Sequence, residues 1–190
     1  MSGIVIVLTE NYADWESALL AAVVRGFYGV EVQTAGPGGL PLTSAGGYRV
    51  SPDLALESLD PAAFDLLVIN GGSVWESDAA PDIGDLLERT RAAGKPIAAI
   101  CGATRALAAA GLLDAVPHTS NGKGYLDGIE NYRGAALYSD RPGAVSAGGI
   151  ITAAGTSPVG FMKAVCETLG FGGQQLDFYT GLLGAEHRAA

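Results

Sequence analysis

One of the two cysteines of this chain lies where a strand pattern changes directly into a helix pattern. Residues 96–100 (PIAAI) have the apolar character of a buried strand, Cys101 follows at once, and strong helix formers predict a helix over residues 103–113. A turn this short needs small neighbours, which Gly102 and Ala103 supply. Because the turn places the sulfur at a helix N-terminus, we expect a lowered thiol pKa and a nucleophilic Cys101 rather than a buried structural one.

Glu16 is the acidic partner that we predict for this thiol. An apolar strand over residues 3–9 leads into a predicted helix over residues 15–27, with Asp14 at the N-cap position and at the rim of the expected pocket. The carboxyl ends of parallel strands meet at one edge of a sheet, so Glu16 should lie near Cys101. A carboxyl group kept protonated by apolar surroundings can donate a hydrogen bond to a thiolate, whereas a solvated carboxylate at a helix start is the alternative.

Glycines and tryptophans near the other strand ends are further pocket candidates. The strand LLVIN ends at Gly71 and Gly72. The amides of Gly72 and Gly102 have no side chain in the way and could bind an oxyanion or a sulfinate oxygen, although paired glycines also form ordinary turns. We expect Trp75, more than Trp15, to form a wall of this pocket, with burial in the core as the alternative.

The histidines and the second cysteine give weaker indications. His118 lies in the loop sequence PHTSNG and could assist Cys101 from a distance, or it could be a plain loop residue, whereas His187 lies in the C-terminal sequence AEHRAA. Cys166 falls on the apolar face of a predicted helix, so we expect a structural role for it. The sequence has no HExxH, CxxC or paired histidine and carboxylate spacing, so we expect neither a metal nor another cofactor.

Strands and helices alternate along the chain, which predicts a doubly wound α/β fold with a mainly parallel sheet. A small hairpin standing off the sheet is expected within residues 40–53. The predicted strands cover residues 3–9, 30–35, 65–70, 96–100 and 150–153, and the predicted helices cover residues 15–27, 83–93, 103–113 and 158–169.

Composition limits the classes of function. The chain has 190 residues, is 48% hydrophobic and has a formal net charge of -9, with its eleven Lys and Arg scattered. One domain over residues 1–190 is expected, and nucleic-acid binding is not. The apolar run at the N-terminus is too short to span a membrane and lacks a basic leader. Two cysteines cannot form a disulfide framework, so we expect a cytoplasmic protein without membrane association.

Three segments resemble motifs of the ThiJ/PfpI superfamily, which includes relatives of the parkinsonism-associated deglycase and of class I glutamine amidotransferases. PIAAICGATRALAAAGLLD looks like the family's nucleophile elbow, IVIVLTENYADWE like its first strand with the pocket glutamate, and LLVINGG like its glycine pair. The similarity extends to ITAAGTSPVGFMKAVCETLG. The resemblance implies a flavodoxin-like three-layer α/β/α sandwich, usually a homodimer, with Cys101 as nucleophile, Glu16 hydrogen-bonded to it, and the Gly72 and Gly102 amides as oxyanion site.

The family's activities are diverse, and they include proteases, amidases, glyoxalases, isonitrile hydratases and redox-sensing chaperones. Members that resemble the intracellular protease have a histidine directly after the nucleophile, where this chain has Gly102. We therefore predict a cysteine-dependent enzyme of hydrolase, hydratase or glyoxalase type, in which Cys101 attacks an electrophilic carbon of a small molecule such as a reactive dicarbonyl. The alternatives are a stress-response protein that senses oxidants through Cys101 or acts as a chaperone, a protease- or amidase-like member, and a non-catalytic ligand-binding domain.

Overall fold

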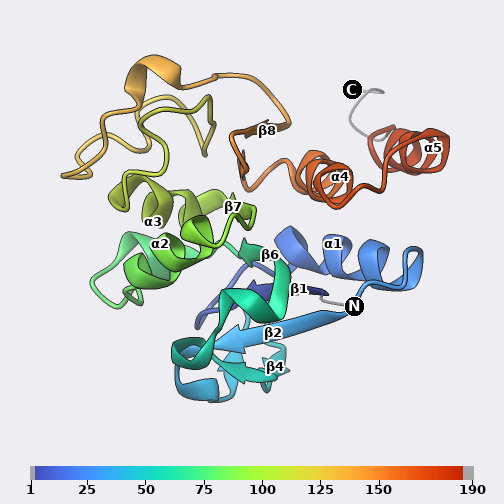
Figure 1. Cartoon of the computed structure of the whole chain (residues 1–190), viewed down its shortest axis with the longest axis horizontal. Coiled ribbons are helices and arrows are strands. Elements are labelled where there is room, and N and C mark those ends of the chain that lie inside the picture. Colours follow the sequence, from blue (N-terminus) through green and yellow to red (C-terminus); the bar gives the residue numbers. More distant parts are fainter. Residues whose placement is uncertain (1–2, 186–190) are drawn as a thin grey trace.

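A seven-stranded sheet lies at the centre of the computed structural model, which describes residues 3–185 (Figure 1). All neighbouring strands of this sheet are parallel except the last pair, in which β8 runs antiparallel to β9. The order across the sheet is β5 (Leu54–Ala55), β2 (Val32–Gly36), β1 (Gly3–Val7), β6 (Phe64–Ile69), β7 (Ile97–Ile100), β9 (Ile150–Ala153) and β8 (Ala144–Ala147).

Helices cover both faces of the sheet, and the described part of the chain has five α-helices. They are α1 (Asp14–Gly26), α2 (Gly84–Ala92), α3 (Thr104–Ala109), α4 (Pro158–Thr168) and α5 (Gln174–Leu183). In Figure 1, α1, α4 and α5 lie together on one side, and α2 and α3 lie together on the other.

Alternation of side chains along each strand builds a separate hydrophobic core on each face. Ile4 and Ile6 of β1 pack in the cluster that contains α1 and α4, whereas Val5 and Val7 pack in the cluster that contains α2 and α3. Every residue of β1 and of β7 is buried, as expected for parallel strands covered on both faces. The predicted flavodoxin-like three-layer sandwich is therefore confirmed, while the extent of a single domain over residues 1–190 stays a prediction.

Several element boundaries differ from those that the sequence predicts. The helix expected over 103–113 is a 3₁₀ turn over Cys101–Ala103 followed by α3, and α3 stops at Ala109, close to Gly111 with its positive φ of +68°. The expected N-cap role of Asp14 is wrong, because Ala13 is the N-cap and Asp14 is the first helical residue. β5, β8 and α5 were not predicted.

The predicted hairpin is confirmed as a separate two-stranded antiparallel sheet of β3 (Leu42–Thr43) and β4 (Arg49–Val50). It is fastened to the loop between β1 and α1. The Thr43 amide donates to Glu10 Oε2 at 3.0 Å, and the Gly46 amide donates to Asp14 Oδ2 at 2.8 Å. The hairpin thus braces the loop and the first residue of α1, two residues before Glu16.

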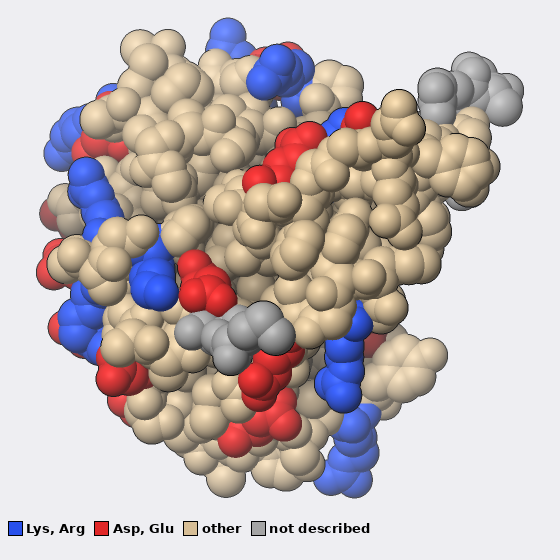
Figure 2. Space-filling model, turned by 45° about the vertical axis from the view of Figure 1, so that its right-hand side comes forward, with Lys and Arg blue, Asp and Glu red and all other residues tan. Residues whose placement is uncertain are grey.

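Charged side chains are dispersed over the surface. On the face drawn in Figure 2, Lys and Arg side chains alternate with Asp and Glu around a broad area of other residues and do not form one continuous basic stripe. Among residues 3–185, no helix is both long enough and apolar enough to cross a membrane.

Candidate active site

The carboxyl ends of three neighbouring strands bring the predicted site residues together. β1, β6 and β7 are adjacent in the sheet, so the loops that follow Val7, Ile69 and Ile100 lie side by side. A bridge between Tyr12 and Gly72 joins two of these loops directly. The convergence expected from the order of the strands is present in the structure.

Cys101 is held in a strained backbone conformation. Its φ is +59°, and Asn11 is the other non-glycine residue with positive φ within the described chain. Such a conformation costs about 1–3 kcal/mol and persists only where the surrounding structure enforces it. The Thr104 hydroxyl donates to the Cys101 carbonyl at 2.6 Å and closes the turn into α3. The geometry is that of a nucleophile elbow, which exposes a side chain at the top of the sheet.

Gly102 is fixed at its position by sterics. A Cβ added there would lie 2.6 Å from the Gly72 carbonyl oxygen and 3.2 Å from the Cβ of Trp75. Such a side chain has no room unless the backbone at Gly72 moves. The glycine directly after Cys101 therefore follows from the close approach of the β6 loop to the elbow, and a histidine would not fit this backbone.

Glu16 lies in the first turn of α1 and is fully buried. Its Oε2 accepts a hydrogen bond from the Gly71 amide at 2.9 Å, whereas its Oε1 is buried and accepts no hydrogen bond from an N–H or O–H group of the described residues. The position that a Cβ on Gly155 would occupy lies 2.8 Å from Glu16 Oε1 and 2.9 Å from Cys101 Sγ. The carboxyl oxygen and the sulfur therefore face one small volume beside Gly155.

Burial opposes the ionisation of both groups. It raises the pKa of Glu16, and interactions with Cys101 and the Gly71 amide lower it in part. Burial also raises the pKa of Cys101, to about 11, and the charge of Glu16 adds to this rise. The lowered thiol pKa expected from the helix N-terminus is not found, because desolvation outweighs the hydrogen bonds from Asn121 and the Gly102 amide.

A residue that sequence reasoning missed completes the surroundings of the sulfur. Asn121 Nδ2 donates to Cys101 Sγ at 3.3 Å, and its Oδ1 accepts from the Gly155 amide at 3.0 Å. On the other side of the same glycine, Trp15 Nε1 donates to the Gly155 carbonyl at 3.0 Å. The polar loop sequence around Asn121 gave no signal beyond its position after the elbow helix.

The two tryptophans exchange their expected roles. Trp75 is buried in the core, and its Nε1 donates to the Asn70 carbonyl at 2.8 Å. Its Cβ lies 3.2 Å from the position that a Cβ on Gly102 would occupy, so Trp75 packs against Gly102. Trp15 is 56% exposed and lies beside the site through its bond to Gly155. Trp15 is thus the tryptophan available to a ligand.

Three other predicted residues lie away from the sulfur or serve another group. Asp14 turns toward Gly46 in the hairpin. The Gly71 amide serves Glu16 rather than an incoming oxyanion. His118 is fully buried, with Nδ1 2.8 Å from the Val116 carbonyl and Nε2 2.8 Å from the Tyr132 hydroxyl. The structure does not bring His118 to Cys101.

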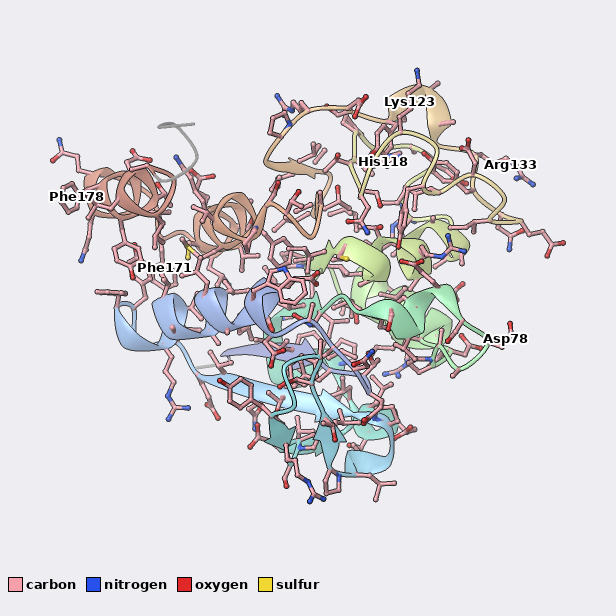
Figure 3. All side chains as sticks on the ribbon, turned by 180° about the vertical axis from the view of Figure 1, so that it is seen from behind. Asp78, His118, Lys123, Arg133, Phe171 and Phe178 are labelled. Atoms are coloured by element: carbon pink, nitrogen blue, oxygen red, sulfur yellow. The ribbon has the colours of Figure 1, made fainter. Side chains whose placement is uncertain are left out.

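The surroundings of His118 are structural in character. In Figure 3 it lies within the loop region above α3, whereas Lys123 and Arg133 of the same region point outward. His187 lies outside the described residues. Cys166 is buried in α4, with its sulfur 3.8 Å from that of Met162. In the described part of the chain, no cluster of three or more His, Cys, Asp or Glu could hold a metal ion.

Comparison with known proteins places this site in a family. A family model described as the DJ-1/PfpI family matches residues 2–168. The crystal structure of the DJ-1 superfamily protein Atu0886 from Agrobacterium tumefaciens is similar with a TM-score of 0.95 and 44% identity, over 98% of this chain and 100% of that one.

Two curated relatives carry different functional names. The uncharacterized protease YoaZ of Bacillus subtilis is 34% identical over 172 residues, which are 84% of this chain and 80% of that protein. The glutathione-independent glyoxalase DJR-1.2 of Caenorhabditis elegans is 33% identical over 114 residues, 59% of this chain and 60% of that protein. The fold, the elbow and these matches lead to one conclusion: the chain belongs to the DJ-1/PfpI family.

Proposed function

We propose that this chain is a cysteine-dependent enzyme that converts small α-oxoaldehydes, such as methylglyoxal, into 2-hydroxy acids. The observation that carries the proposal is that Cys101 Sγ and the buried Glu16 Oε1 both lie within 3.0 Å of the position that a Cβ on Gly155 would occupy. A nucleophile and a proton acceptor on one small site are what addition to an aldehyde carbon requires. The glyoxalase name of the relative DJR-1.2 supports the choice of substrate class.

The raised pKa values of both groups assign a role to each. Burial raises the pKa of both groups and so disfavours two anions side by side, which favours transfer of the thiol proton within the pair over its loss to solvent. Glu16 can therefore take the thiol proton as the sulfur attacks. Its second oxygen stays anchored on the Gly71 amide during this transfer.

In the first step, a bond forms between the Cys101 sulfur and the aldehyde carbon while the carbonyl π bond breaks. The thiol proton passes to Glu16, and the Gly72 and Gly102 amides hold the oxyanion until it receives that proton, which gives a hemithioacetal. The Glu16 carboxylate is then free for the next proton transfer.

In the second step, the hydrogen on the former aldehyde carbon is removed by Glu16 and delivered to the neighbouring carbonyl carbon. The hydroxyl proton of the hemithioacetal moves to the neighbouring oxygen, so the product is a thioester of a 2-hydroxy acid. Water hydrolyses this thioester and regenerates the Cys101 thiol. The whole sequence adds one water to the substrate and needs no external oxidant or reductant.

A protease-like mechanism has less support in this site. Protease-like members have a histidine directly after the nucleophile, yet a side chain at position 102 would collide with the Gly72 carbonyl. The histidine that lies within residues 3–185, His118, has both ring nitrogens engaged elsewhere. The protease name of the relative YoaZ is therefore not our first choice for this chain.

The test is lactate formation from methylglyoxal, followed by NMR, with wild type, Cys101→Ser, Glu16→Gln and Cys166→Ala. We expect turnover by the wild type and by Cys166→Ala, which removes the other thiol, a buried one in α4. Loss of the proton acceptor in Glu16→Gln should lower kcat by at least about a hundredfold, and Cys101→Ser should be inactive.

Absence of lactate with the wild type, or full activity of Cys101→Ser, would overturn the proposal. Mass spectrometry after peroxide treatment of the same proteins distinguishes the proposed enzyme from the alternative, a protein that senses oxidants through Cys101. Oxidation confined to Cys101 without any turnover would favour the oxidant-sensing function instead.

A further inference from the structure

We propose that Asn121 is a positioning residue for Cys101, and that a polar chain of Tyr125 and Glu76 holds the Asn121 amide in place. This inference rests on the proposed function only in that Cys101 must be reactive. Its primary test measures the thiol itself and needs no substrate.

Asn121 makes one hydrogen bond to the Cys101 sulfur and one to the Gly155 backbone beside it. Its Nδ2 donates to Cys101 Sγ at 3.3 Å, and its Oδ1 accepts from the Gly155 amide at 3.0 Å. One planar amide therefore links the nucleophile to the wall of the volume that Glu16 Oε1 also faces. Since a carboxamide is uncharged at every pH, its donor remains directed at the sulfur whether the sulfur is a thiol or a thiolate.

A second set of contacts fixes the loop that carries Asn121. The Tyr125 hydroxyl donates to Glu76 Oε1 at 2.6 Å. Arg105 Nη1 donates to the Tyr125 carbonyl at 3.3 Å, and the Arg105 guanidinium lies 5.8 Å from the centre of the Tyr125 ring. Tyr125 is thus held from the 3₁₀ segment Ser73–Glu76 and from α3, the two elements that flank the elbow.

Asn121 connects these two sets of contacts. Asn121 lies four residues before Tyr125 in the same loop, so the contacts that hold Tyr125 also hold the loop at Asn121. Burial and the bond to Glu76 raise the pKa of Tyr125, and Asn121 lowers it in part. The hydrogen bond of Asn121 to Cys101 likewise lowers the pKa of that thiol. The chain from Glu76 through Tyr125 and Asn121 ends at the sulfur and keeps a donor there.

The experiment is the pH dependence of iodoacetamide alkylation of Cys101 in the Cys166→Ala background. Asn121→Leu removes the donor and the acceptor with little change in size. Asn121→Asp keeps an acceptor for the Gly155 amide but removes the donor to sulfur and adds negative charge. We expect both variants to shift the apparent thiol pKa upward and to slow alkylation at neutral pH by about three- to tenfold.

Tyr125→Phe tests the supporting chain, because it removes the hydroxyl and keeps the ring under Arg105. It should shift the alkylation profile in the same direction by a smaller amount. Tyr132→Phe is the matched control, since it removes a tyrosine hydroxyl bond to His118 in the same region but away from the sulfur. This control should alkylate like the parent protein.

An unchanged profile and rate in Asn121→Leu would overturn the inference, and so would an equal shift in the Tyr132→Phe control. Circular dichroism and thermal unfolding identify variants that fail to fold, in which case Asn121→Asp carries the test. A shifted profile in a protein that never turns over methylglyoxal would leave the role of Asn121 standing and remove the proposed enzyme function. If the wild type turns over methylglyoxal but Asn121→Leu has an unchanged alkylation profile, the proposed enzyme function stands and the role of Asn121 is removed.

Discussion

The Glu16 oxygen and the Cys101 sulfur lie next to Gly155, at 2.8 Å and 2.9 Å from the position that a Cβ on this glycine would occupy. The Gly155 backbone is held from two directions, by Asn121 at its amide and by Trp15 at its carbonyl. At the scale of single residues, the site depends on the absence of a side chain at this position. This dependence is open to a direct test.

We predict that Gly155→Ala inactivates the site while the chain still folds. The added Cβ would lie within 3.0 Å of both Glu16 Oε1 and Cys101 Sγ, so one of them must be displaced. Methylglyoxal turnover and Cys101 alkylation should both fall by at least about tenfold, equivalent to about 1.4 kcal/mol. Gly26→Ala is the control, because a Cβ there meets nothing within 4 Å and should leave both rates unchanged. Normal alkylation in Gly155→Ala would show that the two groups do not share this volume.

Sequence alone predicted that Cys101 and Glu16 would lie close together, because each lies near the point where a strand pattern gives way to a helix pattern, and the structure brings them together. It did not identify Asn121, whose partners are 20 and 34 residues away and meet it only in the folded chain. It also expected a lowered thiol pKa, because the amides at a helix start can be read from sequence and the degree of burial cannot. The ranking of the tryptophans failed for the same reason, since exposure is a property of the packed molecule.

At the scale of elements, the edge of the sheet depends on a polar junction between β2 and β5. The Asp53 carboxylate accepts two bonds of 2.8 Å from Thr34, one from the amide and one from the hydroxyl. The backbone bond is the largest cause that holds the pKa of Asp53 below its ordinary value, and the hydroxyl bond is the next. This junction fastens a strand of two residues that forms the edge of the sheet.

We predict that Asp53 stabilises the fold above its unfolded-state pKa and that this contribution is lost as pH falls through the lower folded-state pKa. Because the group is exposed, the contribution should be no more than about 1 kcal/mol. Urea unfolding at about pH 7 and about pH 3 should show a smaller destabilisation by Asp53→Asn at the lower pH. Asp78→Asn, a change at a side chain that points into solvent in Figure 3, should show no such pH-dependent difference.

The elements that were predicted correctly have a clear hydrophobic pattern in the sequence, either a continuous apolar run or a helical spacing of apolar residues. The elements that were missed include strands with no such pattern. The buried strands β1, β6 and β7 follow from apolar runs, and α1 and α4 follow from apolar positions at three- and four-residue spacing. β5 has two residues, too few for any period. β8 has four, and its pairing with β9 depends on the positive φ angles of Gly148 and Gly149 in the turn between them.

At the scale of the whole molecule, the described surface exposes several large apolar side chains. In Figure 3, Phe178 points away from α5 into solvent, whereas Phe171 lies nearer the body of the molecule, where it stacks on Tyr28 with ring centres 4.5 Å apart. The exposed set consists of Trp15, Phe27, Leu40, Tyr48, Leu137, Phe178 and Leu182. Some of this surface would be covered in a homodimer, which the family resemblance implies for this chain.

We predict that the purified chain sediments at about twice its monomer mass of 19.2 kDa. Sedimentation equilibrium over a range of protein concentrations measures this mass without a shape assumption. The result should be unchanged at moderate salt, because apolar contacts are not screened as surface ion pairs are. A mass equal to that of one chain at every concentration would contradict the prediction.

The close approach of the Gly72 carbonyl to the missing side chain of Gly102 constrains how this sequence can evolve. Any residue larger than glycine at 102 would meet that oxygen at 2.6 Å, so a change there is tolerated only after the β6 loop has moved. A substitution at one of the two positions would therefore have an effect that depends on the residue at the other, which is epistasis with a steric origin. A protein with this backbone could gain a histidine after its nucleophile only if an earlier substitution had already moved the β6 loop away from position 102.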